Sequence, residues 1–231
     1  MILAGECAMF AASGTVRKEA LEIVGTKHDY FVFAPNANGN NPAPIIVLLH
    51  GSGRDGRSLL DPWRKLAERE GLILVAPNAI NPEVWQTVLD GPEPLISIIE
   101  NVEKQYAVDS TRVYLFGHSG GAVFALLMLL WEPRYFAAIS VHAGAFPQWS
   151  EPEAEQAAQA AKRKTPIHIQ VGTEDPLFPL QAVRCTRDLL VAAGFPVDLR
   201  EIPHHDHNYY LMSGRINEQA WSFLSTKRLL E

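Results

Sequence analysis

The sequence predicts an α/β protein built on a doubly wound, mostly parallel sheet, with helices on both faces and no large cap domain. Two observations predict this fold class. Short apolar runs alternate with longer helical patterns along the 231 residues, and most of these runs lack the strict polar–apolar alternation of a strand that faces water. Alternating strands and helices imply right-handed crossovers between parallel strands.

Five apolar runs have the composition of strands covered on both faces: Ile45–Leu49, Leu72–Ala76, Val113–Phe116, Ala137–Val141 and Ile167–Val171. A sixth run, Val197–Ile202, alternates more, which suits a position nearer an edge of the sheet. Residues 20–34 predict one or two antiparallel strands before a turn rich in proline and asparagine at 35–44.

The helices are predicted between these strands. The first starts at Asp61–Pro62, because aspartate is a good N-cap and proline suits the first helical position, and it stops at Gly71. The others are predicted over 94–106, 120–130, 153–162, 180–193 and 215–229. Residues 143–165 are all that separate two successive strands, which is too short for a full cap domain.

We divide the chain into an N-terminal arm, residues 1–19, and a single α/β domain, residues 20–231, because no repeat or linker interrupts the second part. The arm is apolar at its start, but it carries Glu6 and no early lysine or arginine, unlike a secretory signal. No run of about 18 apolar residues occurs, so no transmembrane helix is predicted.

The net charge and the cysteine content limit which partners and which cellular compartment are expected. A formal net charge of −6 without a basic run predicts neither nucleic acid nor an anionic membrane as a partner. The two cysteines, Cys7 and Cys185, are too few for a disulfide framework. We interpret them as free thiols in a reducing, cytoplasmic setting, with a bridge between them as the open alternative. A monomer or a homodimer is expected.

The segment Gly117-His118-Ser119-Gly120-Gly121 has the form G-x-S-x-G between a predicted strand and a predicted helix. A serine nucleophile on such a tight turn needs glycine two residues before and after it, since a side chain there would collide with the neighbouring strand or helix. The alternative is a glycine-rich turn without chemistry. We predict Ser119 as the nucleophile, with Gly117, His118 and Gly121 forming its elbow.

The loop His50-Gly51-Ser52-Gly53 directly follows the strongest predicted strand. Acyl transfer needs two N–H donors aimed at the developing oxyanion, one from the residue after the nucleophile and one from this earlier loop. We predict that these donors are Gly120 and Ser52. His50 is expected to be structural.

A carboxylate at the end of the strand Ile167–Val171 can orient an imidazole. Glu174 and Asp175 both lie there, and we favour Asp175, which lies four residues before the proline that opens the next helix. Glu174 is then a solvated loop residue.

The loop after the last strand contains three histidines, His204, His205 and His207. Metal binding is the alternative reading. Adjacent residues of an extended loop point to different sides, however, so His204 and His205 do not easily share a metal, and we predict no metal. From the residues alone, His205 and His207 are equal candidates for the catalytic base.

Four stretches resemble the α/β-hydrolase superfamily, and more narrowly the phospholipase/carboxylesterase and the polyhydroxybutyrate depolymerase/feruloyl esterase-like esterases. These stretches are LLHGSGRDG (48–56), WRKLAEREGLILVAPN (63–78), YAVDSTRVYLFGHSGGA (106–122) and VGTEDPLFPL (171–180). The segment DHNYY (206–210) is similar to the D-H-S-Y-Y tail of S-formylglutathione hydrolases, where the histidine is the base. The resemblance thus selects His207. The sequence departs from those enzymes at two places. It has Gly120 where they carry methionine, and it has no cysteine over 48–56, where their oxyanion loop contains one.

Together these features predict a serine carboxylesterase that hydrolyses short-chain or exposed esters through an acyl-enzyme on Ser119, with a small-molecule ester as substrate and no cofactor. A thioesterase or peptidase with the same triad, and a non-catalytic binding protein on this scaffold, are the alternatives. The absence of a full cap predicts an open site. Four aromatic residues, Trp85, Phe146, Trp149 and Phe178, are candidates to line it, with core or surface packing as the competing interpretation.

Overall fold

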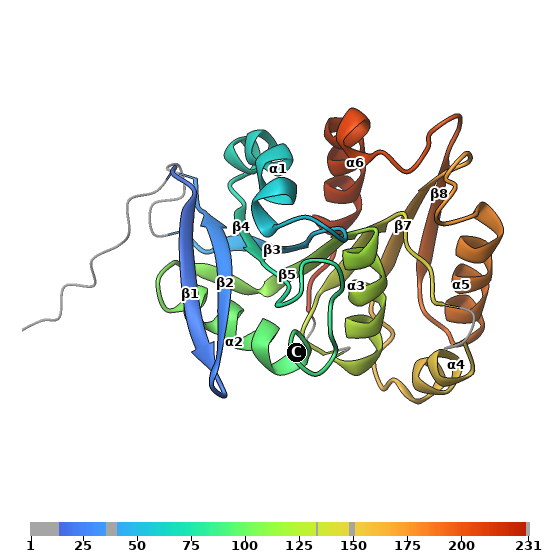
Figure 1. Ribbon diagram of the computed structural model, residues 1–231, viewed down its shortest axis with the longest axis horizontal. Coiled ribbons are helices and arrows are strands. Elements are labelled where there is room, and N and C mark those ends of the chain that lie inside the picture. The colour runs from blue at the N-terminus through green and yellow to red at the C-terminus, as the bar shows by residue number, and fades with distance from the viewer. Residues whose placement is uncertain (1–13, 36–40, 133, 148–150, 230–231) are drawn as a thin grey trace, which may run out of the picture.

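The computed structural model describes residues 14–35, 41–132, 134–147 and 151–229. Eight strands form one sheet in the order β1-β2-β4-β3-β5-β6-β7-β8 (Figure 1). They are β1 (Arg17–Ile23), β2 (Thr26–Phe33), β3 (Ala43–Leu49), β4 (Ile73–Pro77), β5 (Val108–His118), β6 (Ala138–His142), β7 (Ile167–Gly172) and β8 (Val197–Ile202). β3 to β8 pair in parallel, whereas β2 is antiparallel to both of its neighbours. The sheet is therefore mostly parallel, as the sequence predicts.

Helices cover both faces of the sheet (Figure 1). They are α1 (Gly56–Glu70), α2 (Pro92–Glu103), α3 (Gly120–Trp131), α4 (Glu151–Ala160), α5 (Leu180–Ala192) and α6 (Tyr209–Leu224). α1 and α6 pack on one face, and the other four pack on the opposite face. Because side chains alternate along a strand, each central strand serves both cores. In β3, Ile46 and Leu48 face α1 and α6, while Ile45 and Val47 face the other helices.

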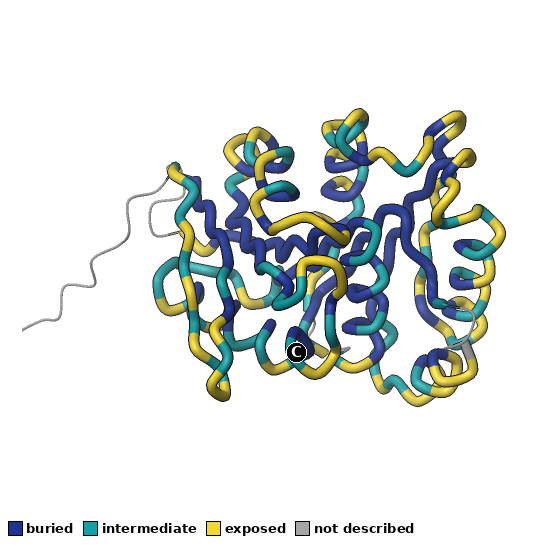
Figure 2. Tube along the Cα trace, viewed as in Figure 1, coloured by how far each residue is buried: buried dark blue, intermediate teal, exposed yellow. Residues whose placement is uncertain are grey.

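β3, β4, β6 and β7 are buried along their length, the carboxyl-terminal half of β5 is buried as well, and exposure rises toward the edges of the sheet (Figure 2). β8 lies at one edge and alternates between half-buried and exposed residues, which confirms the edge position predicted for Val197–Ile202. β1 forms the other edge, and Arg17–Glu19, which we placed in the N-terminal arm, belong to it. The remaining arm residues before 14 and Cys7 lie outside the described residues. Cys185 is exposed and free.

The predicted start of the first helix is wrong. Asp55, not Asp61, caps α1, because its side chain accepts a hydrogen bond of 2.9 Å from the N–H of Ser58. Pro62 therefore lies inside α1. Its missing N–H costs a helical hydrogen bond, but the helix continues because residues on both sides, such as Leu59 and Trp63, are fully buried against the sheet. Gly71 ends α1 in the left-handed conformation, as predicted.

The segment between β6 and β7 contains α4, which packs beside α3 and α5, and no cap domain is present among the residues described. Within the same ranges, no helix has the length and apolarity that crossing a membrane requires. In this part of the chain, the elements add no further layer over the loops that follow the carboxyl ends of β3, β5, β7 and β8.

Candidate active site

Ser119 sits on a strained turn between β5 and α3. Its backbone has φ 55° and ψ −121°, a conformation that costs free energy for a residue with a side chain. A Cβ at Gly117 would lie 2.3 Å from the Gly121 carbonyl oxygen, and one at Gly121 would lie 2.0 Å from the Leu49 carbonyl oxygen. Only glycine fits at both positions, so the elbow geometry explains the G-x-S-x-G spacing.

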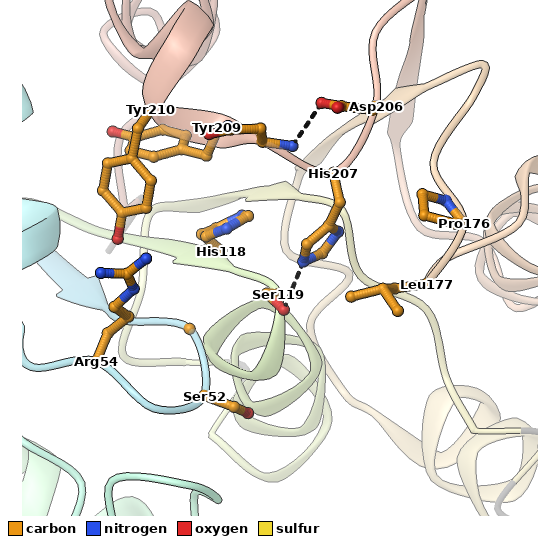
Figure 3. Close-up of a pocket in the computed structure, with 12 residues that line it drawn as sticks. Ser52, Arg54, His118, Ser119, Pro176, Leu177, Asp206, His207, Tyr209 and Tyr210 are labelled. Atoms are coloured by element: carbon orange, nitrogen blue, oxygen red, sulfur yellow. Dashed lines mark hydrogen bonds between the residues drawn. The ribbon is translucent and has the colours of Figure 1, made fainter.

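Ser119, His207 and Asp175 form one hydrogen-bonded series. His207 Nε2 lies 2.9 Å from Ser119 Oγ, and His207 Nδ1 lies 2.9 Å from Asp175 Oδ2 (Figure 3). An ionised carboxylate only accepts hydrogen bonds, so the proton of a neutral His207 is on Nδ1 and its Nε2 faces the serine as an acceptor. This arrangement can withdraw the hydroxyl proton of Ser119.

Asp175 is held as a buried carboxylate. Its Oδ1 accepts hydrogen bonds of 2.9 Å from the N–H groups of Leu177 and Phe178, in addition to the contact with His207. Burial by itself would raise the pKa of Asp175, but the hydrogen bonds from His207, Phe178 and Leu177 outweigh it, so this pKa lies below its ordinary value. The group therefore stays charged at neutral pH.

The two competing side chains point elsewhere. Glu174 lies 2.8 Å from His204 Nδ1, and both of these side chains are exposed. His205 is buried, and its Nε2 lies 3.2 Å from His142 Nε2 instead of approaching Ser119. The structure thus brings together the serine, aspartate and histidine favoured by the sequence and the resemblance.

Three buried imidazoles, those of His118, His142 and His205, bond to one another in series next to Ser119 and His207. His118 Nδ1 lies 3.1 Å from His142 Nδ1, and His142 Nε2 contacts His205 as described above. Burial, as the main cause, lowers the pKa of His118 to about 3 and holds the pKa values of His142 and His205 below their ordinary value. The His118 ring also lies between those of His207 and Tyr209, with centroids 5.1 Å from each; it stacks on Tyr209 and is tilted by 34° against His207. These three imidazoles are therefore neutral at neutral pH, and His118 packs directly against the His207 ring.

The described part of the chain holds no group of three or more histidine, cysteine, aspartate or glutamate side chains that could bind a metal ion. The three imidazoles bond in series through different nitrogens of His142, so they do not converge on one point.

The two predicted oxyanion donors lie next to each other. A Cβ at Gly120 would lie 2.6 Å from Ser52 Oγ and 3.4 Å from Ser52 N, so the loop after β3 abuts the elbow. In the ranges that the structure covers, neither the N–H of Ser52 nor that of Gly120 donates to a protein acceptor. Two free N–H groups beside a nucleophile can hold a developing oxyanion.

His50 and Trp85 support this loop from below. The N–H of Ala79 donates to His50 Nε2 at 3.1 Å, so the proton of His50 is on Nδ1, which lies 2.9 Å from the Gly51 carbonyl. The Trp85 indole N–H donates to the His50 carbonyl at 2.9 Å, and its ring stacks on Phe124 at 5.1 Å. His50 is structural, as expected.

A cavity of about 440 Å³ opens beside Ser119 and His207 (Figure 3). The loops after β3, β7 and β8 and the start of α6 form its walls. The lining residues are Gly51, Ser52, Arg54, His118, Ser119, Pro176, Leu177, Asp206, His207, Asn208, Tyr209 and Tyr210. Arg54 and Tyr210 lie on one side of the Ser119–His207 pair, and Pro176 and Leu177 lie on the other.

Three of the four aromatic residues predicted to line the cavity, Trp85, Phe146 and Phe178, are not among its lining residues. Trp85 and Phe146 are core residues with 8% and 3% exposure, because each fills the space between the sheet and its helices. Phe178 stacks on the His207 ring at 5.8 Å from behind. Trp149 lies outside the described residues.

Sequence reasoning missed the residues that do line the cavity, including Arg54, Leu177 and Tyr210. Their positions in the sequence could have indicated them. Each lies within three residues of a predicted site residue, and those site residues lie in loops at the carboxyl ends of strands. Loops at these ends form the binding crevice in open α/β sheets.

The fold and the site together define a member of the α/β-hydrolase superfamily. The chain belongs to the esterase family, whose model is described as "Putative esterase" and matches residues 96–227, more than half of the chain.

Curated relatives of this chain are named acetylxylan esterases and a feruloyl esterase. The bifunctional acetylxylan esterase/xylanase XynS20E of Neocallimastix patriciarum is 29% identical over 163 residues, which cover 69% of this chain and 23% of that protein. Acetylxylan esterase A of Aspergillus awamori is 26% identical over 129 residues, 49% of this chain and 41% of the relative. The chain thus matches less than half the length of each.

Solved structures share the fold. The fluorophosphonate-binding serine hydrolase FphF of Staphylococcus aureus has a TM-score of 0.78 at 15% identity, covering 92% of this chain and 99% of that one. A ferulic acid esterase has a TM-score of 0.72 at 18% identity, and the match covers 92% of this chain and 97% of that one. S-formylglutathione hydrolase of Agrobacterium tumefaciens has a TM-score of 0.68 at 20% identity, and the match covers 93% of this chain and 95% of that one.

Proposed function

We propose that this chain is a serine carboxylesterase that hydrolyses short-chain or exposed carboxylic esters through an acyl-enzyme on Ser119. The observation that carries the proposal is the series Ser119 Oγ to His207 Nε2 and His207 Nδ1 to Asp175 Oδ2, with 2.9 Å at each contact. Membership of the esterase family supports it.

The first half of the reaction forms the acyl-enzyme. His207 Nε2 takes the Ser119 hydroxyl proton while Oγ bonds to the ester carbonyl carbon, and the carbonyl oxygen becomes an oxyanion. The N–H groups of Ser52 and Gly120 stabilise that oxyanion. Asp175 stabilises the imidazolium without taking its proton. When the carbonyl re-forms, the bond to the alcohol oxygen breaks, and this oxygen takes the proton from Nε2.

The second half releases the acid. His207 Nε2 takes a proton from water as the water oxygen bonds to the acyl carbon, and the same two N–H groups hold the second oxyanion. The bond to Ser119 Oγ then breaks, and Oγ regains a proton from Nε2. These steps use water and the chain's own groups.

The substrate class follows from the surroundings of Ser119. The cavity of about 440 Å³ is walled by the loops after β3, β7 and β8 and by the start of α6. Such a site fits a short acyl group, or an ester exposed on a larger molecule. Relatives named acetylxylan esterase agree with a small acyl group.

The test compares 4-nitrophenyl acetate, butyrate, octanoate and palmitate at pH 7–8 with the wild type and Ser119→Ala. We expect kcat/KM to fall with chain length, and Ser119→Ala to lower it by roughly 10⁴-fold or more, because the nucleophile is lost. Activity that survives in Ser119→Ala would contradict the mechanism. Labelling of Ser119 by a fluorophosphonate without turnover of any ester would shift the proposal to a thioesterase or peptidase.

A second comparison tests the base. His207→Ala removes the imidazole that contacts Ser119, so we expect a loss similar to that of Ser119→Ala. His204→Asn is the matched control, because the exposed His204 side chain contacts Glu174 and asparagine tolerates the φ of 56° at this position. Equal losses in both variants would show that the effect is not specific to His207.

A further inference from the structure

We propose that Arg54 and Tyr210 form a subsite for an anionic group of the ester, such as a carboxylate or sulfate. This proposal rests on the proposed esterase function and adds a substrate class to it. Both residues line the cavity that contains Ser119 (Figure 3). The Arg54 guanidinium lies over the Tyr210 ring, with its central carbon 5.3 Å from the ring centroid.

The charge of Arg54 is not neutralised by the protein. In the described part of the chain, Arg54 forms no ion pair and no hydrogen bond, and its one recorded contact is the Tyr210 ring. A guanidinium presents planar, paired N–H donors that match the geometry of a carboxylate. An exposed arginine aimed into a cavity with free donors therefore has the chemistry of an anion receptor.

Three carboxylates lie near this arginine, those of Asp55, Glu83 and Asp206. Asp55 accepts from the N–H of Ser58 as the cap of α1. Glu83 lies against Gly53, where an added Cβ would be 3.5 Å from its carboxylate oxygen. Asp206 also lines the cavity, but its Oδ1 accepts from the N–H of Asn208 at 2.8 Å and lies away from Arg54 (Figure 3). None of the three forms an ion pair with Arg54.

The backbone holds Arg54 in place from both sides. The N–H of Gly53 donates to the Pro82 carbonyl at 2.8 Å, and Asp55 begins α1. Tyr210 lies in the first turn of α6, next to the fully buried Tyr209, whose hydroxyl donates to Asn217 at 2.7 Å. A receptor on fixed elements loses little entropy when it binds its ligand.

The two sides of the site therefore differ in chemistry. Pro176 and the 65% exposed Leu177 give an apolar wall opposite the cationic wall. An ester with an apolar part and an anionic part on opposite sides of the scissile carbonyl would match both walls. The geometry leaves open which part is the acid and which is the alcohol, so the experiment has two arms.

The first arm compares mono(4-nitrophenyl) adipate with its neutral methyl ester, which places the charge on the acid. The second compares 4-acetoxybenzoate with its methyl ester, which places the charge on the alcohol. For each arm we divide kcat/KM for the anionic ester by kcat/KM for the neutral ester. In the arm whose charge reaches Arg54, we expect Arg54→Gln to lower this ratio by about tenfold, because one charge-assisted contact at an exposed site is lost.

Arg57→Gln is the matched control, because Arg57 is an exposed arginine of α1 that pairs with Asp61 and does not line the cavity. Arg57→Gln should leave both ratios unchanged. Ratios that are the same in the wild type and Arg54→Gln in both arms would overturn the subsite, and so would an equal fall in Arg57→Gln, which would indicate a general field effect.

A binding measurement separates failure of the subsite from failure of the esterase proposal. Calorimetric titration of the Ser119→Ala protein with 4-acetamidobenzoate, an amide that cannot be turned over as an ester, reports the subsite without catalysis. We expect Kd to rise about tenfold when Arg54→Gln is added. Unchanged or undetectable binding would overturn the alcohol-side subsite, whether or not the wild type hydrolyses esters. Adipic acid mono(4-nitroanilide), the amide that corresponds to the first arm, tests the acid-side subsite in the same way, and failure of both probes would overturn the proposal.

Discussion

The contact between His207 Nδ1 and Asp175 Oδ2 decides which imidazole nitrogen faces Ser119. Oδ1 of the same carboxylate is occupied by two backbone N–H groups, so the aspartate cannot rotate away without breaking them. The orientation of His207 is thus built from the loop after β7, and it does not depend on the substrate.

Asp175→Asn tests this dependence. An amide at this position can donate to Nδ1, which favours the tautomer with the proton on Nε2, where it cannot accept from Ser119. We expect kcat to fall by roughly 10³–10⁴-fold in 4-nitrophenyl acetate hydrolysis. Glu174→Gln is the neighbouring control and should retain wild-type kcat, since Glu174 contacts the exposed His204. A fall below tenfold for Asp175→Asn would contradict the proposed role.

At the same scale, the sequence predicted Ser119 and Asp175 by position, because a glycine elbow and a strand end constrain where these side chains point. It did not separate His205 from His207 without the family resemblance. The reason is backbone geometry: His204 has φ 56°, which turns the loop so that His205 points into the core and His207 points to Ser119. A positive φ at a histidine leaves no pattern that a sequence shows.

At the scale of the elements, the turn of the β1–β2 hairpin contains a residue type that its backbone conformation disfavours. Ile23 pairs with Thr26, so the turn has two residues, Val24 and Gly25, and both have positive φ. Two-residue turns of this kind favour Asn-Gly. A β-branched residue is poorly suited to the first position, and Val24 is 87% exposed, so packing does not compensate.

Val24→Asn should therefore stabilise the protein. Asparagine tolerates the left-handed conformation, and we expect the free energy of unfolding to rise by about 0.5–1 kcal/mol in urea denaturation. Val88→Asn is the matched control, because Val88 is 88% exposed but does not have a positive φ. No gain in Val24→Asn, or an equal gain in both variants, would show that the turn is not strained.

Element existence was easier to predict from the sequence than element boundaries. The apolar runs of β3 to β7 mark the centre of the sheet, because strands buried on both faces must be apolar. The prediction for α6 began at 215, whereas the helix begins at Tyr209. Tyr209 is fully buried and bonded to Asn217, so tertiary packing extends the helix beyond its periodic part.

On the scale of the whole molecule, burial of neutral histidines links stability to pH. Six histidines are buried, namely His28, His50, His118, His142, His168 and His205. Burial is the main cause that lowers the pKa of each, to about 3 for His118 and about 4 for His168. The unfolded chain therefore binds more protons than the folded one once the pH falls below the ordinary histidine value of 6.5.

Stability should accordingly fall as the pH drops from 6.5 toward 5, before the carboxylates titrate. Each strongly shifted histidine contributes up to about 1.4 kcal/mol per pH unit. His168 lies away from Ser119, with Nδ1 3.1 Å from Ser140 Oγ. His168→Gln should reduce the slope of unfolding free energy against pH by about that amount in urea titrations at pH 6.5, 5.75 and 5. An unaltered slope in His168→Gln would show that His168 does not drive the acid sensitivity.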